Sequence, residues 1–279
     1  CFSNFSFVSF PESSKPNDKI FYFGNLPPYI NFNCNNVLLQ LSSRFYVDSI
    51  SMKGFKLSHI IKIFLEKIYF ILFIKNVTQV IVQTSSMKNK LIEFGFKKKI
   101  SVWGFDDSGN DTNEKFEKQK NTFIYVASIL PYKNHKRLVK SWKQLKDDGI
   151  SPKLFLTLDG NSRLKKWIEN YVTENKLNIV FLEDINREAL LEIYKTTEYL
   201  IFPSIFEAYG LPLIEAKRYN MKIIAADLDY CWDFIEPDYF FNPYSIDSIT
   251  RSVKRCLKSH KKLDIIYDSK DFFQKILDI

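Results

Sequence analysis

From Thr122 onward, short apolar segments alternate with longer amphipathic ones. The apolar segments have strand length and are rich in branched and aromatic residues, and they lie at 122–127, 153–158, 178–182, 199–202 and 222–226. The segments between them predict helices at 136–145, 162–173, 187–196, 211–219 and 246–258, with Asn186 and Ser245 as N-caps. This alternation favours a parallel sheet with right-handed crossovers and helices on both faces, which is a Rossmann-like α/β domain.

The first hundred residues are less regular. They predict strands at 19–23, 79–82 and 100–103, and helices at 57–74 and 87–94, the second started by Ser85 or Ser86. These elements form part of a second α/β layer, with too few strands for a complete one. We therefore expect a partial N-terminal domain at 1–105, a polar linker at 106–120 and a C-terminal domain at 121–279. Because the sequence starts at Cys1 without a Met, we expect a fragment or a truncated gene.

Charge is concentrated in the first domain. Residues 1–105 hold 13 Lys and Arg against 5 Asp and Glu, so they carry the whole net charge of +8. Such asymmetry indicates an anionic partner. The four cysteines have no metal-binding or disulfide spacing, and we find no signal peptide, so the sequence fits a reducing, cytoplasmic compartment. The longest apolar run, at 68–74, is too short to span a bilayer.

The predicted helix at 57–74 is apolar almost all round, although Lys62 and Lys67 interrupt it. One interpretation is a core helix whose lysines extend to water. The other is a helix that lies in the interface of an anionic membrane, peripheral to its inner face, and brings the site to a lipid-linked acceptor.

The stretch FPSIFEAYGLPLIEAK at 202–217 carries the clearest chemistry. A strand ends at its start, a loop holds Glu207, and Gly210 precedes a helix that has Pro212 in its first turn and Glu215 one turn further on. A helix N-terminus at the carboxyl edge of a parallel sheet is a common site for anionic ligands. Carboxylates suit sugar hydroxyls because their oxygens accept hydrogen bonds from neighbouring OH groups.

The segment FEAYGLPLIEA resembles the E-G-F-G-L-P-x-x-E-A signature of glycosyltransferase family 4, the retaining Glu-x7-Glu enzymes. The resemblance covers 122–279 and extends more weakly to about residue 20. It implies a GT-B fold of two Rossmann-like domains, the N-terminal one incomplete. It also implies that Glu207 contacts the donor sugar, that Glu215 holds the ribose hydroxyls, and that the amides of Gly210 and Leu211 meet the diphosphate.

The loop at 127–134 resembles a second family element, usually G-R-L-x-x-x-K-N. By this resemblance Lys133 neutralises the leaving diphosphate, whereas Ser128 stands where the family has an arginine. Arg137 or Arg163 could supply the missing charge. Leu182 and Glu183 fall in the segment that cradles the nucleotide base in relatives. His135 next to the loop either touches the site or is a polar residue at a helix start.

The resemblance predicts a retaining glycosyltransferase of surface-polysaccharide synthesis that moves a sugar from a nucleotide-diphosphate sugar to a glycan or lipid-linked acceptor. The alternatives are a truncated remnant that binds nucleotide sugars without activity, and a GT-B nucleotide-sugar epimerase. We expect no cofactor and no metal, since Asp227 and Asp229 form a DxD pattern outside its usual context. We also expect no nucleic-acid partner, because the phenylalanines occupy apolar positions. The sequence leaves the sugar, the base and the acceptor open.

Overall fold

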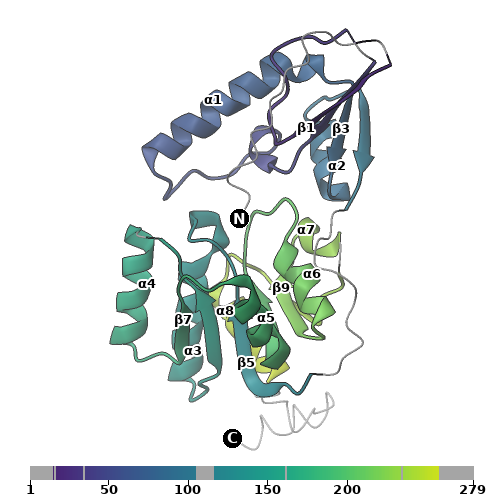
Figure 1. The fold of residues 1–279 in the computed structure, drawn as a ribbon. Helices are drawn as coiled ribbons and strands as arrows, with labels where there is room; N and C mark the ends of the chain where they lie inside the picture. Colours follow the sequence, from purple (N-terminus) through teal and green to yellow (C-terminus); the bar gives the residue numbers. More distant parts are fainter. Residues whose placement is uncertain are drawn as a thin grey trace, which may run out of the picture.

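A computed structural model of the chain describes residues 15, 17–33, 35–104, 116–160, 162–233 and 235–257. The chain forms two α/β halves, each built on its own parallel sheet (Figure 1). The predicted linker lies mostly outside the described residues. Its last two residues, however, belong to a strand, because the first strand of the second half starts at Gln119 and not at Thr122.

The C-terminal half has a six-stranded sheet in the order β10-β9-β8-β5-β6-β7, and every neighbouring pair is parallel. The strands are β5 (Gln119–Tyr125), β6 (Lys153–Thr157), β7 (Ile179–Leu182), β8 (Thr197–Phe202), β9 (Lys222–Ala226) and β10 (Tyr239–Phe241). The central strands are continuous apolar runs because helices cover both faces of the sheet. The prediction of a parallel Rossmann-like sheet is confirmed.

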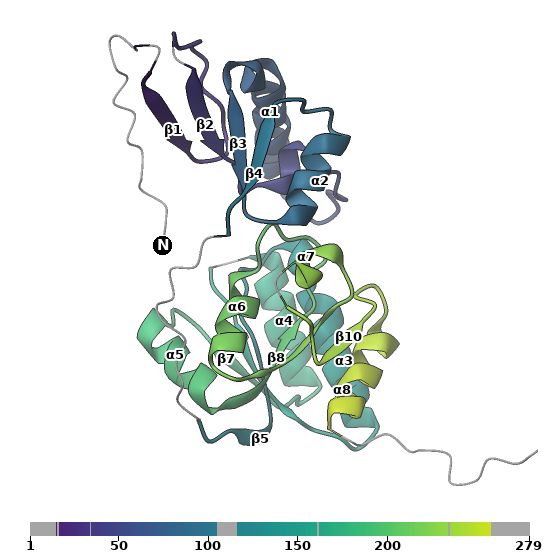
Figure 2. The same ribbon diagram turned by 90° about the vertical axis from the view of Figure 1, so that its right-hand side faces the viewer.

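The helices of this half are α3 (His135–Asp147), α4 (Arg163–Glu174), α5 (Arg187–Thr196), α6 (Leu211–Arg218), α7 (Asp229–Trp232) and α8 (Ile246–Cys256), with a 3-10 turn, η3, at Pro131–Lys133. Helices α3, α4 and α8 lie on one face of the sheet, and α5 and α6 lie on the other (Figure 2). Both predicted N-caps are confirmed. Asn186 accepts a hydrogen bond from the amide of Ala189, and Ser245 accepts one from Ser248.

The N-terminal half has a four-stranded parallel sheet in the order β1-β2-β3-β4. Its elements are β1 (Lys19–Phe23), β2 (Asn36–Gln40), β3 (Gln79–Val82), β4 (Lys99–Val102), α1 (Leu57–Phe73), α2 (Ser85–Glu93), and the 3-10 turns η1 (Arg44–Tyr46) and η2 (Ile74–Asn76). The small core packs β2 and β3 against Phe70 of α1 and against Met87 and Leu91 of α2.

Three short elements were not predicted from the sequence: β2, β10 and α7. Each has at most five residues, so the spacing of its apolar residues is too short to predict a helix or a strand. Its position depends on the neighbouring strands. The helix predicted at 87–94 begins two residues earlier, at Ser85, and its N-cap is Thr84 and neither Ser85 nor Ser86. The Thr84 hydroxyl accepts a hydrogen bond from the amide of Met87. No helix among the described residues is long and apolar enough to cross a membrane.

Candidate functional site

The predicted site residues follow three strands of the C-terminal sheet, β5, β7 and β8. Ser128 and Lys133 come after β5, Glu207 comes after β8, and Glu183 comes directly after β7. All these strands are parallel, so their carboxyl ends meet at one edge of the sheet. This edge is where ligands bind in open α/β folds, and it faces the N-terminal half (Figure 1).

At this edge Lys133 and Glu207 form an ion pair between Nζ and Oε1. Their side chains are only 15% and 11% exposed, so the two charges lie in a largely desolvated place. The Tyr125 hydroxyl donates a 2.7 Å hydrogen bond to the carbonyl oxygen of Lys133. Burial and the Glu207 carboxylate raise the pKa of Tyr132, the residue before Lys133, to about 12. The structure therefore brings together the two residues that the resemblance assigns to the donor sugar and to the leaving diphosphate.

Asn134 joins the loop that carries Lys133 to the segments that follow β8 and β10. It adopts a left-handed backbone conformation, with φ 63°, which Asn tolerates better than most residues. Its side-chain amide donates hydrogen bonds to the carbonyl oxygens of Pro203 at 3.0 Å and Pro243 at 2.7 Å. Because Pro203 immediately follows β8, this one buried side chain fixes the spacing between the Lys133 and Glu207 loops. The sequence pattern contained Asn134 but did not reveal this role.

Gly210 and Leu211 form the start of α6, as predicted. Gly210 has φ 82°, a left-handed conformation that favours glycine, and an added Cβ would meet the Leu213 side chain at 3.1 Å. Helix α6 begins at Leu211, which is exposed, with Pro212 in the first turn. The first amides of α6 thus lie immediately beyond the loop that carries Glu207.

Glu215 lies inside α6 and is buried, with 6% of its surface exposed. Its two carboxylate oxygens are engaged, one by Arg187 of α5 at 2.9 Å and the other by the Tyr194 hydroxyl at 3.2 Å. Burial and the Glu215 carboxylate raise the pKa of Tyr194 well above its usual value, so Tyr194 stays a donor. Glu215 therefore ties α5 to α6 in this structure, a role that the sequence did not indicate.

The remaining predicted residues lie further out along the edge. Ser128 and Glu183 are exposed, and Glu183 pairs with Lys165 at 3.0 Å. Leu182, the last residue of β7, is half-buried. Of the two arginines proposed to replace the missing one, Arg137 donates to the Asn134 side chain at 3.0 Å, next to Lys133, whereas Arg163 is an exposed residue at the start of α4.

His135 is a buried residue at the start of α3 with 1% exposure. Burial and the nearby Lys133 charge lower its pKa to about 3, so the imidazole is neutral at physiological pH. Neither ring nitrogen has a hydrogen-bond partner among the described residues, and the ring packs against Tyr125 with centroids 5.1 Å apart. Its contacts are therefore those of a core residue that packs against Tyr125, the residue that bonds the Lys133 backbone.

Arg44 of the N-terminal half reaches the site from η1, although nothing in the sequence pattern singled it out. It donates a 3.0 Å hydrogen bond to the carbonyl oxygen of Glu207 and a 2.6 Å charged one to Asp48. It is 9% exposed, and its Nε has no partner in the part of the chain that the structure describes. The guanidinium also lies over the ring of Phe206, 5.2 Å from its centroid.

Aromatic rings surround this contact. Phe45 packs against Phe206 with centroids 4.9 Å apart and against Tyr132 at 5.7 Å, and Phe55 stacks on Tyr132 at 6.0 Å. We call Phe45, Phe55, Tyr132 and Phe206 the aromatic cluster. Two of its members come from the N-terminal half, and the other two adjoin Lys133 and Glu207 directly. The two halves therefore meet on the loops that carry the site.

On the roles that the resemblance implies for Lys133 and Glu207, we expect Arg44→Ala to lower kcat by about ten-fold or more, because a displaced Glu207 backbone would misplace this pair. The KM for the donor should change less, because Arg44 bonds the backbone carbonyl of Glu207 and leaves the Glu207 side chain in place. Steady-state kinetics with Arg44→Lys and Arg44→Ala checks this, with the exposed Arg251→Ala as the matched arginine control. A kcat equal to that of Arg251→Ala would show that Arg44 does not position the loop.

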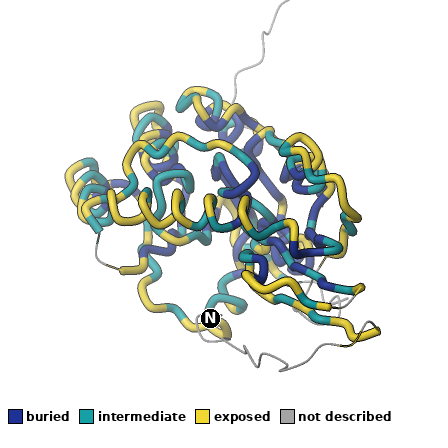
Figure 3. Tube along the Cα trace, turned by 90° about the horizontal axis from the view of Figure 1, so that it is seen from above, coloured by how far each residue is buried: buried dark blue, intermediate teal, exposed yellow. Residues whose placement is uncertain are grey.

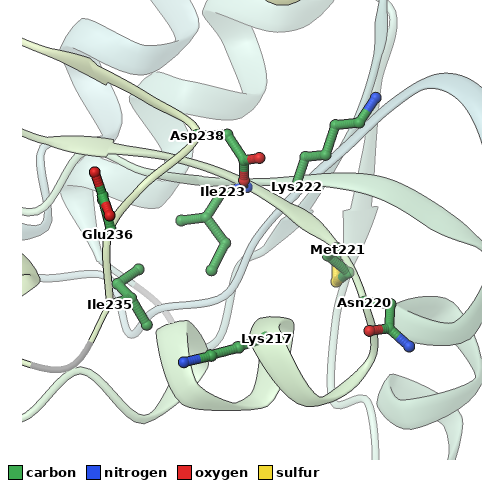
Figure 4. Close-up of a pocket in the computed structure, with 8 residues that line it drawn as sticks. All are labelled: Lys217, Asn220, Met221, Lys222, Ile223, Ile235, Glu236 and Asp238. Carbon is green, nitrogen blue, oxygen red and sulfur yellow. Dashed lines mark hydrogen bonds between the residues drawn. The ribbon is translucent and has the colours of Figure 1, made fainter. Parts of the chain in front are cut away.

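A cavity of about 430 Å³ lies elsewhere, between α6, β9 and the segment before β10 (Figure 4). It is lined by Lys217, Asn220, Met221, Lys222, Ile223, Ile235, Glu236 and Asp238. Since Lys222 is the first residue of β9, the cavity is at the amino end of that strand and away from the candidate site.

The residues of the DxD pattern do not gather into a metal site. Asp227 accepts a 3.1 Å hydrogen bond from the Trp232 indole, and Asp229 starts α7. Within the described ranges no three His, Cys, Asp or Glu side chains lie close enough together to hold a metal ion.

The sequence profile of the family described as Glycosyl transferases group 1 matches residues 108–270, more than half of the chain. The chain belongs to this family. A capsular polysaccharide biosynthesis glycosyltransferase of Staphylococcus aureus, CapH, is 32% identical over 177 residues, which are 62% of this chain and 46% of CapH. The serotype-specific mannosyltransferase WbdA of Escherichia coli is 26% identical over 144 residues, covering 50% of this chain and 18% of WbdA. The chain thus spans less than half the length of these relatives.

Solved structures confirm the fold. TarM of S. aureus, in complex with Fondaparinux, alpha-GlcNAc-glycerol and UDP, superposes with a TM-score of 0.64 at 17% identity, over 81% of this chain and 44% of TarM. HepE of Anabaena, in complex with UDP and glucose, gives a TM-score of 0.56 at 14% identity, over 79% of this chain and 62% of HepE. The architecture is that of GT-B glycosyltransferases, as the sequence predicted.

Proposed function

We propose that the chain is part of a retaining glycosyltransferase that moves a sugar from a nucleotide-diphosphate sugar to a glycan or lipid-linked acceptor in surface-polysaccharide synthesis. The observation that carries this proposal is the buried Lys133–Glu207 pair at the carboxyl edge of the sheet, next to the exposed N-terminus of α6. The similarity to CapH, of capsular polysaccharide biosynthesis, and to the mannosyltransferase WbdA supports it. We further propose that the protein acts in the cytoplasm, in peripheral contact with an anionic membrane.

The chemistry follows from the charges at this edge. The bond between the sugar and the diphosphate breaks with its electrons going to the phosphate oxygen, so negative charge grows on the leaving group. The Lys133 ammonium and the amides of Gly210 and Leu211 would stabilise that charge in a site that excludes much of the water. Glu207 would accept hydrogen bonds from donor-sugar hydroxyls, and Glu215 from those of the ribose. Ser128, Leu182 and Glu183 would border the nucleotide.

The acids of the N-terminal half argue against the epimerase alternative, which needs an acid and a base of its own there. Asp48 is paired with Arg44 at 2.6 Å, and Glu93 is paired with Lys90 at 2.9 Å. Glu66 accepts a hydrogen bond from the Tyr46 hydroxyl at 3.2 Å. The other acid of this half that the structure describes, Asp18, caps the amide of Lys15 at an exposed position. Each of these four carboxylates is therefore engaged by a residue of the N-terminal half.

Release of free nucleoside diphosphate tests the proposed function. We expect release only when a donor nucleotide sugar and an acceptor are both present, and we expect Glu207→Gln to lower the rate by about ten-fold or more while nucleotide binding persists. The assay covers a panel of donors, with polysaccharide or lipid-linked acceptors from surface-glycan synthesis. Tight binding of a nucleotide sugar without release under any acceptor would instead identify a binding remnant. Interconversion of two nucleotide sugars without acceptor would identify an epimerase.

A further inference from the structure

Helix α1 presents an apolar face to solvent. Of its residues, which the structure describes throughout, Phe70 is buried against the sheet. Large apolar side chains that are between 39% and 71% exposed lie on the opposite side, and these are Leu57, Ile61, Phe64, Leu65, Ile68, Ile71 and Leu72. They follow one another at spacings of three and four residues, so they form a continuous stripe along the helix. The helix lies along the surface of the N-terminal half (Figures 1 and 3).

This stripe contradicts the interpretation of α1 as a core helix. A core helix would bury these side chains, whereas here the buried side of α1 is narrow and includes polar Glu66, whose carboxylate meets Tyr46. Exposed apolar surface of this extent on a folded domain marks a site of contact with a membrane or a partner.

The charges around the stripe favour a membrane with anionic headgroups. Lys62, which is 70% exposed, lies on one flank of the stripe and Lys67 lies on the other. Lys53 and Lys56 precede the helix and Lys75 follows it, all exposed. Between Asp48 and Glu93 the sequence contains a single acid, Glu66, which points away from the stripe. An apolar face bordered by lysines is the pattern of a helix that lies in a bilayer interface.

The position of α1 connects this surface to the site. Phe55, two residues before the helix begins, stacks on Tyr132 with an interplanar angle of 17°. The start of α1 is therefore next to the loop that carries Lys133. We propose that the outer face of α1 docks on the surface of an anionic bilayer, and that this docking holds the Lys133–Glu207 edge near a lipid-linked acceptor. The second half of this inference rests on the proposed transferase reaction, whereas the docking rests only on the exposed face of α1 and the lysines around it.

Co-sedimentation of the full chain with vesicles tests the docking. The wild-type protein should pellet with phosphatidylglycerol vesicles, much less with phosphatidylcholine vesicles, and less again in high salt. Phe64→Glu should reduce the bound fraction by about ten-fold or more, as should the double substitution Lys62→Glu and Lys67→Glu. The matched control is Ile92→Glu, because Ile92 is a large apolar residue of α2 in the same half and is 53% exposed, against 63% for Phe64. That control should bind like wild type.

The results distinguish docking on a bilayer from self-association of the chain. Wild-type protein that stays in the supernatant with pure phosphatidylglycerol vesicles at low salt would overturn the proposal, as would equal binding by Phe64→Glu. A dimer that Phe64→Glu dissociates, without vesicle binding, would overturn it too and would identify a second copy as the occupant of the stripe. Vesicle binding is measured without donor or acceptor, so a failure of the transferase assay leaves its result intact. Transfer to a short water-soluble acceptor should be the same for Phe64→Glu and wild type.

Discussion

Lys133→Ala is expected to lower the rate of transfer by about a hundred-fold or more. Lys133 is the cation that the structure places against Glu207 at the carboxyl edge, and Ser128 stands at the arginine position of the family pattern that this loop resembles. A charge-assisted contact to the developing negative charge on the leaving phosphate is worth several kcal/mol, about 3 kcal/mol for a strong donor. Single-turnover measurement of transfer, with saturating donor, checks this result.

Two controls separate the lost phosphate contact from a local disturbance. Lys133→Ala leaves the Glu207 carboxylate, 11% exposed, without its partner, and an unpaired buried charge has its own cost. The double variant Lys133→Ala with Glu207→Gln removes that charge, and it should be no faster than Lys133→Ala alone. Lys136 lies three residues after Lys133, is exposed, and packs over the ring of Trp167. Lys136→Ala should therefore be nearly neutral. Activity of Lys133→Ala within a factor of about three of wild type, under 1 kcal/mol of barrier, would show that another group holds the phosphates.

Glu215→Ala is expected to weaken binding of the nucleotide by about ten- to a hundred-fold. The ribose would lose its hydrogen bonding to the carboxylate, and one hydrogen bond to a charged group is worth about 1.5–3 kcal/mol, which is about ten- to a hundred-fold in affinity. Titration calorimetry with a panel of nucleoside diphosphates measures the effect. Wild-type affinity in this variant would disprove the assignment of Glu215 to the ribose.

The structure makes a further control necessary, because Glu215 also joins α5 to α6. Arg187→Ala removes the 2.9 Å ion pair but keeps the carboxylate, and Arg187 is 54% exposed at its side chain. If ribose binding is what matters, Arg187→Ala should keep most of the affinity, and Glu215→Gln should lose part of it. If both Arg187→Ala and Glu215→Ala lower the melting temperature and the affinity together, the carboxylate acts by holding the helices in place.

Many helices and strands of the C-terminal half could be predicted, because short sequence segments are enough to define them. Each predicted strand of that sheet contains an apolar run bounded by polar links, and the predicted caps are single side chains, Asn186 and Ser245, that bond three residues ahead. The pairing of Lys133 with Glu207 was foreseeable for a related reason. Both residues follow strands that a parallel sheet aligns at one edge, so the topology brings them together once it is known.

The remaining contacts depend on tertiary packing, which no local pattern expresses. Arg44 and the carbonyl of Glu207 are 163 positions apart in the chain, and Arg187 and Glu215 are 28 apart. The outer face of α1 was ambiguous for a different reason. A helix that is apolar almost all round has no broad polar face that would mark its solvent side, so the placement of Phe70 decides which side faces the sheet.

The aromatic cluster also bears on how quickly a spent nucleotide could leave. A hinge motion that widened the gap between the halves would have to pull Phe45 and Phe55 away from Tyr132 and Phe206. Each ring pair is worth about 1 kcal/mol beyond the apolar area it hides from water. Because Tyr132 and Phe206 adjoin Lys133 and Glu207, the same motion would also weaken the contacts that we propose between these loops and the phosphates. An exit along this route would thus proceed at the speed of domain opening, independent of how fast the glycosidic bond is made.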